Sequence, residues 1–224
     1  MQIRSQGTIY YKEDNKIISK IVHFFLKRIG KKIDANKLKK FIDLSYVIVE
    51  KITIKLNKLI IGYVEFYKEM VEDEIKMANI SIYDEVLHVG CGSVPATSIL
   101  IAKKTGAKTI GIDNNICAVE EALYCLSEVT DSDNIQIKHA EASQFPVETF
   151  DVIVVSQGVE PHAEILKYIA QSMKGDARVI FRTNSSVEGE LTQNDVFLKN
   201  LFNIVKLVSH EEYGLSASAL LLKK

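Results

Sequence analysis

Glu85-Val-Leu-His-Val-Gly-Cys-Gly-Ser-Val-Pro95 is the stretch of sequence that decides the fold class. Its first five residues form a short apolar run, which predicts a buried strand. Gly90 and Gly92 then allow the backbone to turn tightly and to approach a ligand without an intervening Cβ. The next segment, Thr97–Lys104, predicts a helix that ends at Gly106. A strand, a glycine-rich turn and a helix in this order indicate the first unit of an α/β sheet.

The alternation of strands and helices continues toward the C-terminus. Apolar runs predict further strands at Thr109–Ile112, Ile135–Lys138, Val152–Val155 and Arg178–Phe181, with helices at Ala118–Glu128 and Glu164–Met173. Such alternation is typical of βαβ units and a parallel sheet. The last two predicted strands, Ile204–Val208 and Ser218–Leu222, are joined too closely for a parallel crossover and should form an antiparallel hairpin. The sequence therefore predicts a Rossmann-like, seven-stranded α/β sheet of the class I methyltransferase type, with a parallel core and a C-terminal hairpin.

Residues 1–80 have a different pattern, which predicts a small all-α domain. Apolar residues recur at helical spacing between Ile17 and Ile29, and helices are also predicted over 38–54 and over Leu59–Met77. We therefore expect two domains, a helical one at 1–80 and the sheet domain at 81–224. The first has 16 Lys and Arg against 10 Asp and Glu, and the second has 12 against 19. The two domains should thus differ in their electrostatic character.

Composition narrows the classes of protein that fit. The net charge of −1, the absence of Trp and the acidic sheet domain argue against a nucleic acid as partner. Three cysteines without a CxxC spacing argue against a disulfide framework or a zinc site. The chain begins without an apolar signal region and has no apolar run long enough to span a membrane. We expect a cytoplasmic protein with no membrane partner, and a homodimer is left open.

Polar residues follow the predicted strands, whose carboxyl ends face the ligand crevice of an open α/β sheet. Asp113 ends the second strand, 21 residues after Gly92, where a carboxylate can accept both ribose hydroxyls of a nucleoside. Asn114 follows it directly. Glu141 comes after the third strand, where a side chain reaches the adenine edge. The alternatives are a helix-capping acid at Asp113 and a solvated loop acid at Glu141.

The fourth and fifth predicted strands end in residues that should line the same crevice. Ser156 and Glu160 belong to the segment Ser-Gln-Gly-Val-Glu-Pro161 after the fourth strand. Arg182 ends the fifth strand, and its guanidinium could hold a substrate carboxylate through two parallel hydrogen bonds. A structural ion pair is an equally weighted alternative for Arg182.

Pro95 separates two possible cofactors. The dinucleotide fingerprint G-x-G-x-x-G requires a third glycine at position 95, whereas Pro95 offers no amide to a phosphate. S-adenosylmethionine has no phosphate, and its methionine part needs only the loop backbone. Pro95 therefore favours S-adenosylmethionine. The predicted cofactor-binding residues are Gly90, Cys91, Gly92, Pro95, Thr97, Asp113, Asn114, Glu141 and Ser156. A metal site at His88, Cys91 and His139 is not expected, because His88 lies in a buried strand and Cys91 in a turn.

The loop Gly90-Cys-Gly-Ser-Val-Pro-Ala-Thr-Ser-Ile99 resembles the glycine-rich loop of the nicotianamine synthases, G-x-G-P-x-P-x-T-x-I. Val159-Glu-Pro161 and Phe181-Arg-Thr183 are also similar to the archaeal members, and the resemblance covers most of residues 60–222. Ser93 departs from the pattern, because the family has a proline there. Related bacterial enzymes make opine metallophores by the same reaction as the nicotianamine synthases.

The resemblance implies an enzyme that moves the 3-amino-3-carboxypropyl group of S-adenosylmethionine to the amine of an amino-acid-like acceptor. Methylthioadenosine would leave, and the product would be of the metallophore type. The resemblance also implies that residues 1–80 cover the acceptor side of the cleft, with Tyr67 and Glu50 as catalytic residues and Tyr63, Glu160 and Arg182 near the substrate. Tyr63 is the alternative to Tyr67 for the functional tyrosine of the family. The alternatives are a small-molecule methyltransferase, a less favoured RNA methyltransferase, and a non-catalytic sensor.

Overall fold

The computed structural model of the chain describes residues 48–51, 53, 59–129, 133–184, 190–210 and 216–224. The helix predicted between Ile17 and Ile29 lies outside these residues, as does most of the helix predicted over 38–54. Residues 48–51 are helical.

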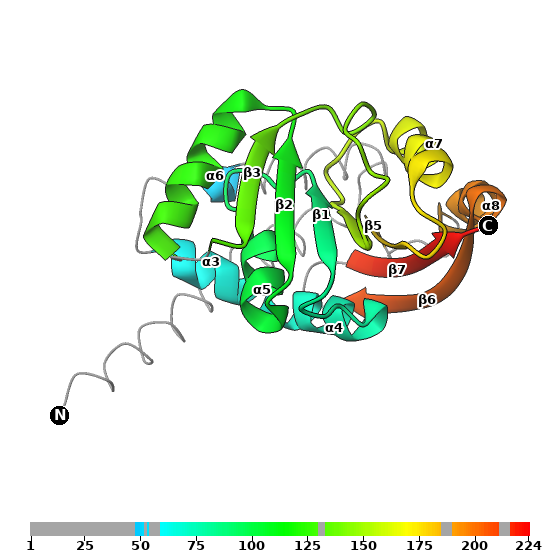
Figure 1. Cartoon of the computed structure of the whole chain (residues 1–224), viewed down its shortest axis with the longest axis horizontal. Helices are drawn as coiled ribbons and strands as arrows, with labels where there is room; N and C mark the ends of the chain where they lie inside the picture. Colours follow the sequence, from blue (N-terminus) through cyan, green and yellow to red (C-terminus); the bar gives the residue numbers. More distant parts are fainter. Residues whose placement is uncertain (1–47, 52, 54–58, 130–132, 185–189, 211–215) are drawn as a thin grey trace, which may run out of the picture.

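Seven strands of the described residues form one sheet, in the order β3-β2-β1-β4-β5-β7-β6. The strands are β1 Glu85–Val89, β2 Lys108–Asp113, β3 Ile135–His139, β4 Val152–Val155, β5 Arg178–Asn184, β6 Phe202–His210 and β7 Ser216–Lys223. The first five pair in parallel, whereas β7 is antiparallel to both β5 and β6. The predicted fold class is therefore confirmed. Figure 1 shows β2 between β3 and β1, with β6 along the opposite edge of the sheet.

Helices cover both faces of the sheet. The four helices α3 Ile60–Phe66, α4 Lys68–Ala78, α5 Ala96–Thr105 and α6 Ile116–Val129 contribute to one apolar cluster. The helices α7 His162–Ser172 and α8 Glu190–Leu201 contribute to the other. Strands β1 and β4 between them are almost fully buried, as the continuous apolar runs predict. Figure 1 shows α3 and α6 at one end of the molecule and α7 and α8 at the other.

The structure differs from the prediction at two places: one predicted helix is divided in two, and one helix was not predicted. The single helix predicted over Leu59–Met77 consists of α3 and α4, which meet at Tyr67. The Tyr67 amide donates to the carbonyl of Val64 at 3.2 Å, three residues back, so the chain tightens there into a 3₁₀-type turn. The helix α8 was not predicted, because its sequence has too few apolar residues for a clear amphipathic pattern.

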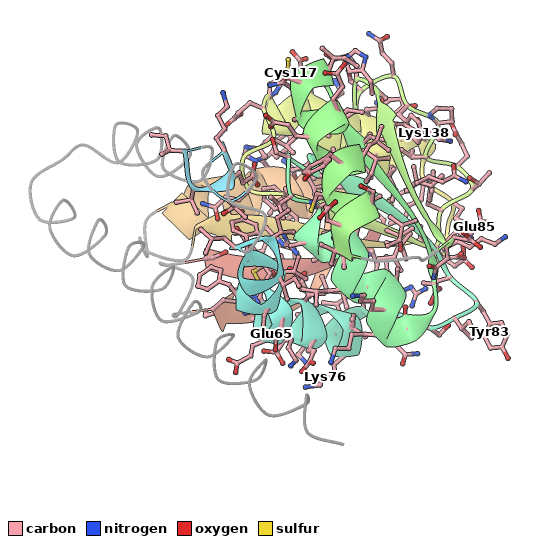
Figure 2. All side chains as sticks on the ribbon, turned by 90° about the vertical axis from the view of Figure 1, so that its left-hand side faces the viewer. Glu65, Lys76, Tyr83, Glu85, Cys117 and Lys138 are labelled. Carbon is pink, nitrogen blue, oxygen red and sulfur yellow. The ribbon has the colours of Figure 1, made fainter. Side chains whose placement is uncertain are left out.

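The predicted boundary between the two domains falls in the turn between α4 and β1. Tyr83 in this turn is 92% exposed, and Figure 2 shows it projecting from the edge of the molecule near Glu85. The helices before the turn nonetheless pack on the sheet domain, since Arg178 of β5 donates to the carbonyl of Ala78 at 2.6 Å. The division at residues 80 and 81 stays a prediction.

Candidate active site

A cavity of about 470 Å³ lies where the carboxyl ends of β1, β2, β4 and β5 meet α3 and the start of α5. Its size is within the range of small-molecule sites, which is about 300–1,000 Å³. Every site residue predicted from the sequence lines this cavity except Pro95. Pro95 is instead the N-cap residue of α5 and is buried behind the loop. The structure thus brings together side chains from positions 50 to 182.

The glycine-rich loop needs glycine at both of its predicted positions. Gly90 and Gly92 have φ values of +74° and +66°, in the left-handed region that other residues rarely adopt. A Cβ on Gly92 would also lie 2.8 Å from Oε1 of Glu50. The loop is therefore shaped to let a carboxylate from the helical region approach its backbone.

Asp113 holds this loop to the end of β2. Its Oδ2 accepts a hydrogen bond from the Gly92 amide at 2.9 Å, and its Oδ1 accepts one from the Asn115 amide at 3.0 Å. Asn114 lines the cavity beside it, and Glu141 lies on its exposed rim beyond β3. A ligand that lies across the loop would meet these polar groups along the carboxyl edge of the sheet.

Glu50, Tyr63 and Tyr67 form a chain of hydroxyl and carboxylate groups in the cavity wall. The Tyr63 hydroxyl donates to Oε1 of Glu50 at 3.1 Å. The hydroxyls of Tyr63 and Tyr67 are 3.3 Å apart, and their rings lie 5.1 Å apart between centroids. All three residues line the cavity, and Glu50 at one end of the series contacts the glycine-rich loop through the Ser93 amide. This arrangement can pass a proton from Tyr67 through Tyr63 to Glu50.

Glu50 has the proton affinity that a general base needs near neutral pH. Burial raises its pKa to about 7, and the charges of Asp113 and Glu121 act in the same direction. Hydrogen bonds from the Ser93 amide and the Tyr63 hydroxyl oppose this rise, because they favour the charged carboxylate. A carboxyl group with a pKa near the working pH is suited to accept and release a proton.

Sequence reasoning did not include Glu74, which holds Arg182 in place beside the cavity. Arg182 Nε donates to Oε1 of Glu74 at 2.8 Å and Nη2 donates to Oε2 at 2.7 Å. Nη2 also donates to Oγ1 of Thr97 at 2.9 Å. Burial opposes the charge of Arg182, but attraction and hydrogen bonding to Glu74 raise its pKa above the usual value. The two parallel hydrogen bonds expected of Arg182 are therefore made to Glu74.

The Glu74 carboxylate extends this network to the C-terminal hairpin. Its Oε1 also accepts a hydrogen bond from Oγ of Ser218 at 2.6 Å, and that hydroxyl lies 3.1 Å from Nε2 of His210. Glu74 is fully buried. The sequence signal was weak, because Glu74 belongs to the charged run Glu72-Asp-Glu74, which is typical of a solvated helix face.

His88 lines the cavity and was not predicted to have a role. Its Nδ1 and Nε2 each lie 2.9 Å from a serine hydroxyl, of Ser98 and Ser156 respectively. Burial lowers the pKa of His88 to about 3, and the charge of Arg182 adds to this effect, so the imidazole is neutral. It therefore orients Ser156 at the cavity without adding charge.

The described residues offer no metal centre. None of their His, Cys, Asp and Glu side chains gather in a group of three or more that could hold a metal ion. His139 is exposed and lies 3.0 Å from the carbonyl of Asn114, whereas Cys91 is buried. Across the same part of the chain, every helix is too short or too polar to cross a membrane.

Comparison with known proteins supports the fold. Residues 87–181 match the family described as a methyltransferase domain. The chain is also 28% identical over 126 residues to an L-histidine 2-aminobutanoyltransferase of Pseudomonas aeruginosa, a match that covers 54% of this chain and 46% of the relative. A second strain of that species has a similar relative at 27% identity. The chain spans about half the length of the curated relatives it matches.

Solved structures extend the likeness beyond the sheet. A mutant of the nicotianamine synthase MtNAS, in complex with S-adenosylmethionine, has a TM-score of 0.68 at 15% identity, covering 96% of this chain and 98% of that chain. An RNA methyltransferase from Salinibacter ruber has a TM-score of 0.54 at 13% identity and covers 70% of this chain and 92% of that chain. The chain has the class I methyltransferase fold. The resemblance to nicotianamine synthases is confirmed at the level of the fold.

Proposed function

We propose that the protein is an S-adenosylmethionine-dependent transferase that moves a 3-amino-3-carboxypropyl group to the amine of an amino-acid-like acceptor. The observation that carries the proposal is the hydrogen-bonded series Glu50–Tyr63–Tyr67, which lines the same cavity as the glycine-rich loop. The backbone of the loop would bind the donor, and Glu50 with its two tyrosines would provide the base that deprotonates the acceptor. The L-histidine 2-aminobutanoyltransferase relatives make L-histidine the first acceptor to test.

The sheet domain would bind the donor. Asp113 and Glu141 lie at the ends of neighbouring strands and would accept hydrogen bonds from the ribose and adenine of S-adenosylmethionine. Gly90 and Gly92 keep the loop free of side chains where the methionine part would lie. The neutral His88 suits a cationic sulfonium, because a protonated imidazole would repel it. Ser156, which His88 orients, would complete the donor site.

The helical region would prepare the acceptor. The amine nitrogen of the acceptor attacks the carbon of the aminocarboxypropyl group that is bonded to the sulfonium. A C–N bond forms, and the C–S bond breaks with its electron pair going to sulfur. The amine releases one proton, which passes through Tyr67 and Tyr63 to Glu50. In-line placement of the nitrogen at roughly 3–3.5 Å from that carbon would favour this carbon over the methyl group.

The division of the chain at residues 80 and 81 then has a functional meaning. Glu50, Tyr63 and Tyr67 come from the helical side, and the donor-binding residues come from the sheet side. Glu160 on the exposed rim and the guanidinium of Arg182 would face the acceptor, with Arg182 held in place by Glu74. Both substrates are metabolites of the cell interior, which is consistent with a cytoplasmic enzyme.

The nucleoside product is the most direct test of this function. Incubation with S-adenosylmethionine and L-histidine is expected to give methylthioadenosine and an acceptor that carries one added aminocarboxypropyl group, both identified by mass spectrometry. Other amino acids serve as competing acceptors, and a reaction without acceptor is the control. S-adenosylhomocysteine as the sole nucleoside product would instead assign a methyltransferase, which the family match of residues 87–181 makes the second candidate.

Asp113→Ala is expected to weaken binding of S-adenosylmethionine by about 1–3 kcal/mol, the scale of losing hydrogen bonds to a charged group. The same change frees the Gly92 amide, so the loop loses its anchor to β2. Titration calorimetry measures the loss. Glu148→Ala, which removes an exposed charge outside the cavity, is the matched control. Equal affinity in the two variants would remove Asp113 from the donor site.

A further inference from the structure

Ser93 makes two hydrogen bonds to carboxylates, and neither bond has a part in the proposed reaction. Its amide donates to Oε2 of Glu50 at 3.3 Å, and its hydroxyl donates to Oε2 of Glu121 at 2.6 Å. Ser93 is buried, with 6% of its surface exposed, and Glu121 is half-buried on α6. One residue of the glycine-rich loop therefore joins the base to a second acid from a different helix.

We propose that Glu121 is a positioning residue for Glu50: it holds Ser93 so that the Ser93 amide faces the Glu50 carboxylate, and it places a second acidic side chain next to the same loop residue. The inference rests on the proposed role of Glu50 as the proton acceptor. A proline at position 93, as in the loop motif of the nicotianamine synthases, would have neither the amide hydrogen nor the hydroxyl. The contact is therefore a feature of a loop that has serine at this position.

The two contacts act on Glu50 in opposite directions. The Ser93 amide stabilises the charged carboxylate, which lowers its pKa, whereas the charges of Glu121 and Asp113 raise it. The Tyr63 hydroxyl lowers it as well, and the Tyr67 hydroxyl follows in the same chain.

Among the described residues, two buried thiols also interact with Glu50. Burial raises the pKa of Cys91, and the charges of Asp113 and Glu50 raise it further. Burial also raises the pKa of Cys125 to about 12, and the charge of Glu50 adds to this effect. Both thiols are therefore neutral at the working pH. The acidic charges that face Glu50 within the described residues come from Asp113 and Glu121.

Glu121→Gln separates the charge from the contact, because a glutamine oxygen still accepts the Ser93 hydroxyl. Glu50 must be ionised to accept a proton, so kcat/KM rises with pH through the pKa of Glu50 in the free enzyme. Loss of the Glu121 charge lowers that pKa, and the rising limb is expected to move to lower pH by about half a unit to one unit. Ser93→Pro removes the amide donor and is expected to move the limb to higher pH.

The control is Glu120→Gln, which removes the same charge from an exposed neighbour on α6. Donor affinity, measured by calorimetry, shows that each variant is folded. Infrared titration of the Glu50 carboxyl, isolated by subtracting the Glu50→Gln spectrum, follows the same shift without turnover. A wild-type protein that forms no methylthioadenosine would contradict the proposed function, while the infrared titration would still test the Glu121 contact. The inference is overturned if Glu121→Gln shifts this titration no more than Glu120→Gln does.

Discussion

Glu50→Gln is expected to lower kcat/KM for the acceptor by roughly 10²–10⁴-fold, the usual contribution of acid–base assistance. The amide keeps the shape of the side chain and can still accept the hydrogen bond of Tyr63, but it cannot take up a proton. Affinity for S-adenosylmethionine should change less than turnover, because the amide can still accept a hydrogen bond from the Ser93 amide and so keep the loop in place. The rate of methylthioadenosine formation and calorimetric binding of the donor measure the two effects.

The pH profile gives this prediction a second readout. With a pKa of about 7 for Glu50, kcat/KM of the wild-type protein should rise with pH through neutrality, and Glu50→Gln should lose this limb. Glu69→Gln, an acid on α4 outside the cavity, is the control. Tyr67→Phe should also lower kcat/KM for the acceptor by roughly 10²–10⁴-fold. In the double variant the loss of kcat/KM should be smaller than the product of the two single losses, because the two groups act as a unit. If Glu69→Gln lowers kcat/KM as much as Glu50→Gln does, Glu50 is excluded as the base.

Glu74→Gln is expected to lower the free energy of unfolding by about 3–5 kcal/mol, the scale of leaving a buried charge without its partner. Arg182 is 5% exposed, and both of its parallel hydrogen bonds go to Glu74. A neutral amide can accept only one of them. Urea unfolding, followed by circular dichroism, gives the free energy from the midpoint and slope.

Glu72→Gln on the same helix is the matched control. Glu72 pairs with Lys104 at 2.6 Å, and their side chains are 33% and 40% exposed, so this pair is expected to contribute only about 0–1 kcal/mol. Replacing Glu74 and Arg182 together by Leu and Met should cost less than the sum of the single changes, because neither charge is then left alone. Equal unfolding free energies for Glu74→Gln and Glu72→Gln would show that the buried pair does not stabilise the fold.

Much of the sheet could be predicted because its signals are local. β1 and β4 have the predicted bounds, since each is a continuous apolar run that ends at a turn or a polar residue. Gly106 ends α5 in a left-handed conformation, as its position after the helix predicts. The C-terminal hairpin followed from the short connection alone. These features depend on a few consecutive residues and need no information from distant parts of the chain.

The candidate site could be predicted only where a motif or a strand end marked it. The spacing of Tyr63 and Tyr67 places both on one helical face, but only their contact with Glu50 shows which way that face points. Glu74 and Arg182 are 108 residues apart, and Ser93 and Glu121 are 28 apart. Each of these two contacts depends on how α4 or α6 packs on the rest of the fold, and the local sequence does not predict this packing. Glu141 and Glu160 were assigned from their positions after strands, whereas Pro95 was assigned from the loop motif and does not line the cavity.

The bond between Glu74 and Ser218 has a consequence for the order in which the protein matures. It joins residues 144 positions apart, and its second partner belongs to β7, which follows the other six strands of the sheet in the sequence. A nascent chain that still lacks β7 would have the glycine-rich loop and the tyrosines but would leave the Glu74 carboxylate short of a donor. Contacts of such long sequence separation form late and slow the folding of the whole domain. The hydrogen-bond network that holds Arg182 should therefore be completed only after β7 has paired with β5, which makes ligand binding a late event on the folding path.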